Sequence, residues 1–161
     1  MTSLYESDFA SWIDSQVRAI RKVAKSGTNL PIDFENVAEE LADMGRSEKR
    51  ALKSALVRII EHLLKLEFSP ASGPRAGWRR SVTVHRQQVA DIVADSPSLG
   101  GLDQLDTAYE DARQLAALGL QQDGIADSTL PAECPYSRDQ VTNRNFWPEN
   151  RHGITAGHAA E

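Results

Sequence analysis

The sequence predicts an all-α fold, an antiparallel bundle of about five helices with a short irregular C-terminal appendage. Apolar residues recur at three- and four-residue steps along most of the chain, segments with Gly and Pro separate these stretches, and no stretch alternates as a strand would. The 161 residues, 40% hydrophobic and 25% charged, fit one globular domain. We expect this domain at residues 1–150 and a mobile tail at residues 151–161, which has little to bury.

The first helix is predicted at residues 8–26. Ser7 or Asp8 can cap its start, and Gly27 with Pro31 shortly after it can end it. Its apolar stripe consists of Phe9, Trp12, Ile13, Val17, Ile20 and Val23. Such a stripe is typical of an amphipathic helix that packs on one side.

The next helical segments are predicted at residues 33–45 and 47–67, with Asp33 as the capping residue of the first. Gly45 permits a kink or break between them, and the sequence leaves open whether they form one helix. The predicted buried stripe of the first segment is Phe34, Val37, Leu41 and Met44.

The prolines and the glycine at residues 69–74 predict a loop that reverses the chain. An apolar stripe that includes Trp78 and His85 then predicts a fourth helix, which ends near Asp95. We expect the helices on either side of the loop to pack antiparallel.

Ser96 and Pro97 suit the start of a fifth helix, predicted to run to Gly119. Periodicity fades after that point, but residues 137–140 carry the capping box of one short helix. Residues 146–148 can fold back on the helices as an apolar patch.

The composition excludes several classes of protein. The start of the chain lacks the basic and apolar run of a secretory signal, and no apolar stretch reaches the roughly 18 residues of a membrane span. Cys134 is the single cysteine, so no internal disulfide can form, which suits a reducing compartment. We therefore expect a cytoplasmic protein that does not use a membrane.

Charge is distributed unevenly, although the net charge is only −5. Residues 47–90 hold nine Lys and Arg against three Asp and Glu, while residues 1–46 and 91–161 are acidic. Either acidic neighbours neutralise the basic segment, or this segment forms a face for an acidic partner such as nucleic acid. The candidate binding residues on such a face are Lys49, Arg50, Arg58, His62, Arg79 and Arg86.

A series of short sequence blocks occurs in one order between residues 4 and 149. The blocks are YESDF at 5–9 with Trp12, DFENVAEE at 33–40, MGRSEKR at 44–50, HLLK at 62–65, GWR at 77–79, DSPSL at 95–99, AYEDAR at 108–113 and CPY at 134–136. In this combination the chain resembles a bacterial family known as domain of unknown function 29. The resemblance implies an all-helical fold and a bacterial cytoplasmic protein, and it brings no activity, cofactor or catalytic residue with it.

Arg80 and His85 are the candidate catalytic residues. His85 lies on the apolar stripe of its helix, where a histidine is most often a core residue with a hydrogen-bond partner. One Arg, four residues and one His, however, also resemble the motif of HEPN-type ribonucleases, in which a dimer brings two such pairs to an RNA backbone. In that interpretation Arg80 stabilises phosphate charge and His85 acts as acid or base.

Glu35, Glu39 and Asp43 follow one edge of a predicted helix at four-residue spacing. Carboxylates so arranged can bind a hard cation. The Glu-x-x-His pattern of di-iron bundles occurs only at residues 149–152, in a segment predicted to be irregular, and neighbouring arginines can neutralise the acidic edge. We therefore expect no metal and no cofactor, with these three residues as the candidates if a metal is bound.

The remaining polar residues form helix faces and salt-bridge patterns, and no nucleophile set or phosphate loop is visible. We therefore expect a non-enzymatic protein-interaction module of unknown partner, with a homodimer among the options. The first alternative is a nucleic-acid-binding or RNA-cleaving domain that uses residues 47–90. The second is a carboxylate metal-binding bundle.

Overall fold

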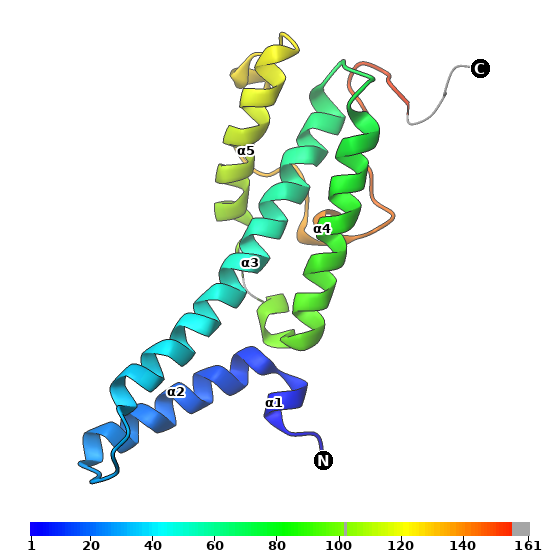
Figure 1. Cartoon of the computed structure of the whole chain (residues 1–161). Helices are drawn as coiled ribbons and strands as arrows, with labels where there is room; N and C mark the ends of the chain where they lie inside the picture. Colours follow the sequence, from blue (N-terminus) through cyan, green and yellow to red (C-terminus); the bar gives the residue numbers. More distant parts are fainter. Residues whose placement is uncertain (102, 156–161) are drawn as a thin grey trace. The chain divides into compact units, whose positions relative to one another are not determined.

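The chain is helical in its described part, which in the computed structural model comprises residues 1–101 and 103–155 (Figure 1). The elements are α1 (Leu4–Ser7), α2 (Phe9–Ser26), α3 (Phe34–Phe68), α4 (Arg75–Asp95), the 3-10 helix η1 (Pro97–Gly101), α5 (Leu105–Gln122), the 3-10 helix η2 (Asp127–Thr129) and α6 (Arg138–Thr142). These residues include no strand, which confirms the all-α class. None of the described helices is both long and apolar enough to cross a membrane.

The described residues form two compact units. Unit 1 comprises those of Met1–Leu52 and Asp91–Leu102, and unit 2 those of Lys53–Ala90 and Asp103–Glu161. Helices α3 and α4 contribute residues to both units. Each unit has its own buried apolar side chains, among them Ile13, Ala38, Leu52 and Leu99 in unit 1 and Ile59, Leu63, Val82 and Leu120 in unit 2.

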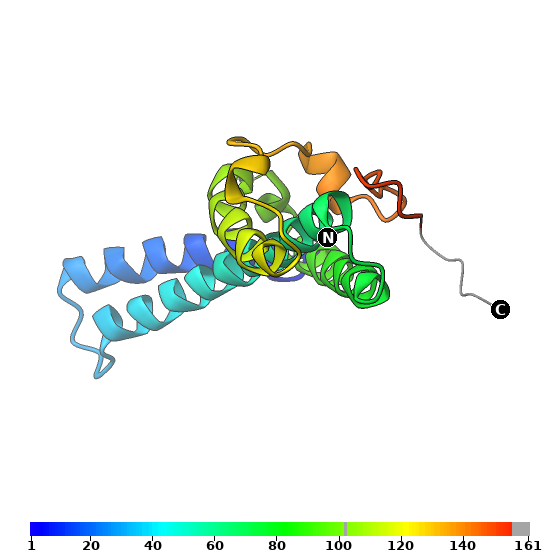
Figure 2. The same cartoon turned by 90° about the horizontal axis from the view of Figure 1, so that it is seen from above.

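In unit 1, α2 and the first part of α3 form an antiparallel hairpin, seen in both Figure 1 and Figure 2. The Ser11 amide donates to the Asp8 carboxylate at 3.0 Å, which caps α2, and Gly27 ends this helix in the left-handed conformation at φ 75°. The Asn36 amide donates to Asp33 at 3.1 Å at the start of α3. These ends confirm the predicted caps, because short polar side chains and glycine satisfy the free groups at helix ends.

The face of α3 that meets α2 is made of small residues. Ala38 is 0% exposed, and a side chain at Gly45 would meet Ile13 at 3.4 Å. Val37 and Met44, predicted to be buried, are instead 42% and 46% exposed. The predicted period is correct but the predicted face is wrong, because small residues let the two helices approach more closely than large ones would.

The segments predicted at residues 33–45 and 47–67 belong to the single 35-residue helix α3, which is one of the two arrangements that the sequence left open. Both boundaries of the fifth predicted helix differ from the prediction. The helix predicted to start at Pro97 starts at Leu105, after η1, and it continues past Gly119. Gly119 does not end the helix but makes room, since a Cβ there would lie 2.7 Å from the Lys65 side chain.

In unit 2, α3 and α4 run in opposite directions on either side of the loop, as predicted (Figure 1). The C-terminal segment is irregular apart from α6, which begins at the predicted capping box of Ser137 and Gln140. The Asn150 side chain donates to the carbonyls of Leu66 and Ser69, both at 2.8 Å, and so ties the segment to the end of α3. Of the tail predicted to be mobile, residues 156–161 lie outside the described residues.

Candidate functional site

Exposed large apolar side chains are concentrated in unit 1. Eight of the eleven in the described part of the chain belong to it, although unit 2 contains more residues. They are Met1, Leu4, Tyr5, Val23, Leu30, Ile32, Val37 and Met44. Three of them belong to the first five residues, and the other five lie on α2, α3 and the loop between them. Contiguous exposed apolar surface often marks a binding site.

Part of this set follows one face of α3. Val37 and Met44 are seven residues apart with the half-buried Leu41 between them, so the three side chains form one stripe. Val23 is 39% exposed near the end of α2. Together with two residues of the connecting loop, these form a set of exposed or half-buried apolar residues on the hairpin: Val23, Leu30, Ile32, Val37, Leu41 and Met44.

Three aromatic rings lie at the other end of α2. The ring of Tyr5 on α1 stands edge-on to Phe9 and Trp12, with centroid distances of 5.7 and 4.8 Å. Phe9 and Trp12 are stacked at 5.7 Å. Tyr5 is 56% exposed, so this cluster adds an aromatic surface to unit 1.

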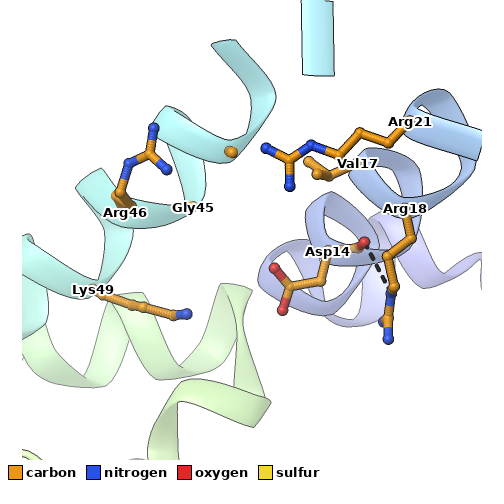
Figure 3. A pocket seen from close by; sticks show the side chains of 8 residues that line it. Asp14, Val17, Arg18, Arg21, Gly45, Arg46 and Lys49 are labelled. Carbon is orange, nitrogen blue, oxygen red and sulfur yellow. Dashed lines mark hydrogen bonds between the residues drawn. The ribbon is translucent and has the colours of Figure 1, made fainter. Parts of the chain in front are cut away.

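A hollow of about 390 Å³ lies between α2 and α3 (Figure 3). Its lining residues are Asp14, Val17, Arg18 and Arg21 of α2 and Ala42, Gly45, Arg46 and Lys49 of α3. Arg21 reaches from α2 toward Gly45, and Lys49 reaches from α3 toward Asp14 (Figure 3). The lining therefore carries four cations and one carboxylate.

Two acidic residues outside the lining hold two of these arginines. One oxygen of Glu39 accepts from Arg21 at 3.2 Å, and the other accepts from Arg46 at 2.6 Å. Arg46 also donates to Asp43. Its hydrogen bonds to Asp43 and then to Glu39 raise the pKa of the Arg46 guanidinium, which stays charged at every ordinary pH.

Two of the three predicted metal-ligand candidates take part in these ion pairs with arginine. Glu39 and Asp43 pair with Arg46, which is the neutralisation by arginine that the sequence left open, and Glu35 is exposed in the first turn of α3. Among the described residues, no three His, Cys, Asp or Glu side chains are grouped so that they could hold a metal ion. The geometry therefore gives a carboxylate metal site no support.

The six predicted binding residues do not share one unit. Lys49 lines the hollow and Arg50 is exposed, both in unit 1. The other four are in unit 2: Arg58, His62, Arg79 and Arg86. The basic segment of the sequence therefore does not belong to a single compact body.

Glu61 is a buried carboxylate, 5% exposed, beside two of these residues. It accepts from Lys65 at 2.7 Å and from Arg58 at 2.9 Å. The Nδ1 atom of His62 lies 2.9 Å from the carbonyl of Arg58, and burial lowers the pKa of His62. This face of α3 is partly covered, because Gly119 lets α5 approach the Lys65 side chain.

Arg86 is also buried, 2% exposed, and its guanidinium donates to three backbone carbonyls. The Arg79 guanidinium lies 4.0 Å from the centroid of the Trp147 ring, and that of Arg86 lies 5.0 Å from it. Trp147 thus folds back on α4, where the sequence predicted an apolar patch. Arg86 holds the C-terminal segment and is not part of an open binding surface.

The candidate catalytic pair is spread around α4. Arg80 is exposed, whereas half-buried His85 has its Nδ1 atom 2.8 Å from the Ser81 carbonyl. Residues five apart on one helix are rotated by about 140° from each other. One copy of the chain therefore does not bring Arg80 and His85 to the same side, and catalysis by this pair stays a prediction.

Sequence reasoning missed Arg18 and Arg21 as site residues. They lie in residues 1–46, which are acidic overall, so a search for segments rich in Lys and Arg does not select them. The signal that could have found them is their spacing from Asp14, which places all three on one flank of α2 next to the buried face.

The comparisons with known proteins agree with the fold and name no activity. The family described as Domain of unknown function DUF29 matches residues 4–147, which confirms the resemblance seen in the sequence. A crystal structure of an alpha-helical protein of unknown function from Rhodospirillum rubrum is similar, with 28% identity and a TM-score of 0.74. The similarity covers 91% of this chain and 93% of that one. None of the curated proteins matches the chain.

Proposed function

Because the chain belongs to the family described as Domain of unknown function DUF29, whose description names no activity, we propose its function from the surface of unit 1: a protein-interaction module that binds a helix of a partner protein. The observation that carries this proposal is the concentration of exposed apolar side chains in unit 1. A bacterial cytoplasmic location belongs to the proposal, in keeping with the bacterial source of the similar structure and with the single cysteine.

The stripe on α3 supports a helical partner. Side chains at positions i, i+4 and i+7 form a ridge that packs into the groove of another helix. Val37, Leu41 and Met44 form such a ridge, and the caps at Asp8 and Asp33 fix the two helices of the hairpin. A surface that is already ordered loses little conformational entropy when a partner binds.

Nucleic-acid binding through residues 47–90 is supported less well. Arg58 is paired with Glu61. Lys53 is paired with Asp111 at 2.8 Å. The six candidate binding residues are also divided between the two units, so residues 47–90 do not supply one basic surface on a single compact body.

Replacing Val37 and Met44 together by Glu is expected to reduce partner binding by at least about tenfold, because two carboxylates would have to be desolvated in an apolar contact. The whole chain is used as bait in a lysate of its source organism, and the captured proteins are quantified by mass spectrometry. Light scattering of the purified chain tests in parallel for a second copy as the partner.

The matched control replaces Val84 and Leu118 by Glu, since these unit 2 side chains are also exposed, at 55% and 64%. Recovery of the partner by this control is expected to stay within about twofold of that by the unaltered chain, as is usual for surface substitutions outside a binding site. Equal losses in both double variants would refute the proposal. A monomer that captures nothing would refute it as well.

A further inference from the structure

We propose that the hollow between α2 and α3 binds a phosphate-bearing small molecule, a site that the protein interaction proposed above does not use. A volume of about 390 Å³ is within the range of small-molecule sites. Its cations come from both helices, Arg18 and Arg21 from one and Arg46 and Lys49 from the other. A bound anion would therefore be contacted from two sides.

The arginines are held in place without being saturated. Arg21 donates to Glu39 through one terminal nitrogen, and a guanidinium has five N–H donors. The same Glu39 carboxylate accepts from Arg46 of its own helix, so it links Arg21 of α2 to Arg46 of α3. An arginine fixed on one side by a carboxylate needs little reordering to donate to a ligand on its other side.

The charge of the lining favours a multiply charged anion. Glu39 and Asp43 offset part of the positive charge, but neither lines the hollow. Arg21, Arg46 and Lys49 surround the space with the single carboxylate of Asp14, while Arg18 donates to the Asp14 carbonyl of its own helix and points away (Figure 3). A phosphate group offers up to two negative charges and three acceptor oxygens, which match guanidinium and ammonium donors better than one carboxylate does. The negative charge of Asp14 repels such a ligand. Removing this charge is therefore expected to strengthen anion binding.

The hollow is separate from the apolar stripe on α3. Val37 belongs to the stripe and Ala42 to the lining, and five residues of helix correspond to a rotation of about 140°. Binding of an anion and binding of a partner helix therefore use different sides of α3. The failure of one proposal leaves the other standing.

The test is a titration of the ¹⁵N-labelled whole chain with inorganic pyrophosphate at constant ionic strength, followed by NMR. We expect the Gly45 amide, which lies in the lining, to shift and to saturate, while Gly119 and Gly124 of unit 2 stay in place. Citrate, a polycarboxylate of comparable charge, is titrated in the same way. It is expected to bind at least about tenfold more weakly than pyrophosphate, because it lacks phosphate oxygens.

Variants that remove a lining cation are compared with variants that remove an equal charge nearby. Arg21→Ala and Lys49→Ala are each expected to weaken pyrophosphate binding by about tenfold, the loss typical of a charge-assisted contact. Lys22→Ala and Arg50→Ala remove exposed cations outside the lining. These two variants are expected to change the affinity for pyrophosphate by less than about twofold. Asp14→Asn is expected to increase the affinity for pyrophosphate by about threefold.

Three results would overturn the proposal. The first is the absence of a saturable shift at Gly45. The second is an equal effect of the lining variants and their controls, which indicates general surface attraction only. The third is citrate binding as tight as pyrophosphate binding, which removes the phosphate class. Pyrophosphate binding to the Val37→Glu, Met44→Glu variant is expected to be unchanged, which separates this site from the interaction surface.

Discussion

Replacing Arg86 by Met is expected to lower the free energy of unfolding by about 3 to 5 kcal/mol, the largest effect of a single substitution that we expect in unit 2. The buried guanidinium donates to the carbonyls of Val141 at 2.8 Å, Phe146 at 2.9 Å and Gln140 at 3.0 Å. Met has a similar length but leaves these three acceptors without their donor. Urea unfolding followed by circular dichroism measures the change.

The control for this prediction is Arg80→Met, which removes an exposed arginine of the same helix and is expected to cost less than about 0.5 kcal/mol. Burial lowers the pKa of Arg86 from the ordinary value of an arginine to about 10, so the side chain is charged in both the folded and the unfolded chain at neutral pH. The folded chain binds fewer protons only between these two values, where stability rises with pH. The effect of Arg86→Met is therefore expected to be flat between about pH 5 and pH 8. Equal costs for the two substitutions would contradict the anchoring role of Arg86.

Glu61→Gln is expected to lower the free energy of unfolding by about 2 kcal/mol at neutral pH, because it leaves two cations without their carboxylate. The Lys65 side chain is 15% exposed and that of Arg58 is 51% exposed, so water compensates for part of the loss. The exposed pair of Lys53 and Asp111 supplies the control. Asp111→Asn is expected to cost less than about 1 kcal/mol.

The effect of Glu61→Gln should depend on pH. Burial raises the pKa of Glu61, but the hydrogen bond and the charge of Lys65, the hydrogen bond from Arg58 and the charge of His62 outweigh this and hold the pKa below the ordinary value of 4.5. A carboxylate whose folded-state pKa is depressed adds stability above the unfolded-state value and loses it as pH falls through the folded-state value. The difference between the two proteins is therefore expected to be constant above about pH 5 and to shrink below 4.5. A difference that grows in acid would contradict the ion pair.

The helices could be predicted from the sequence because their signals are local. Asp8, Gly27 and Asp33 mark helix ends through groups within a few residues, and all three have the predicted roles. The buried face of α3 could not be predicted in the same way. Periodicity fixes the spacing of a stripe, but the choice between Val37 and Ala38 depends on how closely α2 approaches, which is a tertiary property.

For the candidate sites, too, local properties could be predicted from the sequence and tertiary contacts could not. The sequence gives the charge of each residue, but whether a cation is free depends on partners that are distant in the chain. Arg86 meets carbonyls more than fifty residues away, and Arg21 meets Glu39 on the next helix. The hollow between α2 and α3 was not visible in the sequence for this reason, since its two halves come from segments that each carry their own acidic residues.

The central claim, that unit 1 binds a partner through the exposed apolar residues of its hairpin, is tested most directly by photo-crosslinking in living cells of the source organism. A benzophenone-bearing amino acid is placed at Met44 in one variant and, as control, at Leu118 in another, since both side chains are exposed. We expect light to produce one defined adduct from position 44, with another protein or a second copy, and none from position 118. No adduct from position 44, or the same adducts from both positions, would contradict the claim.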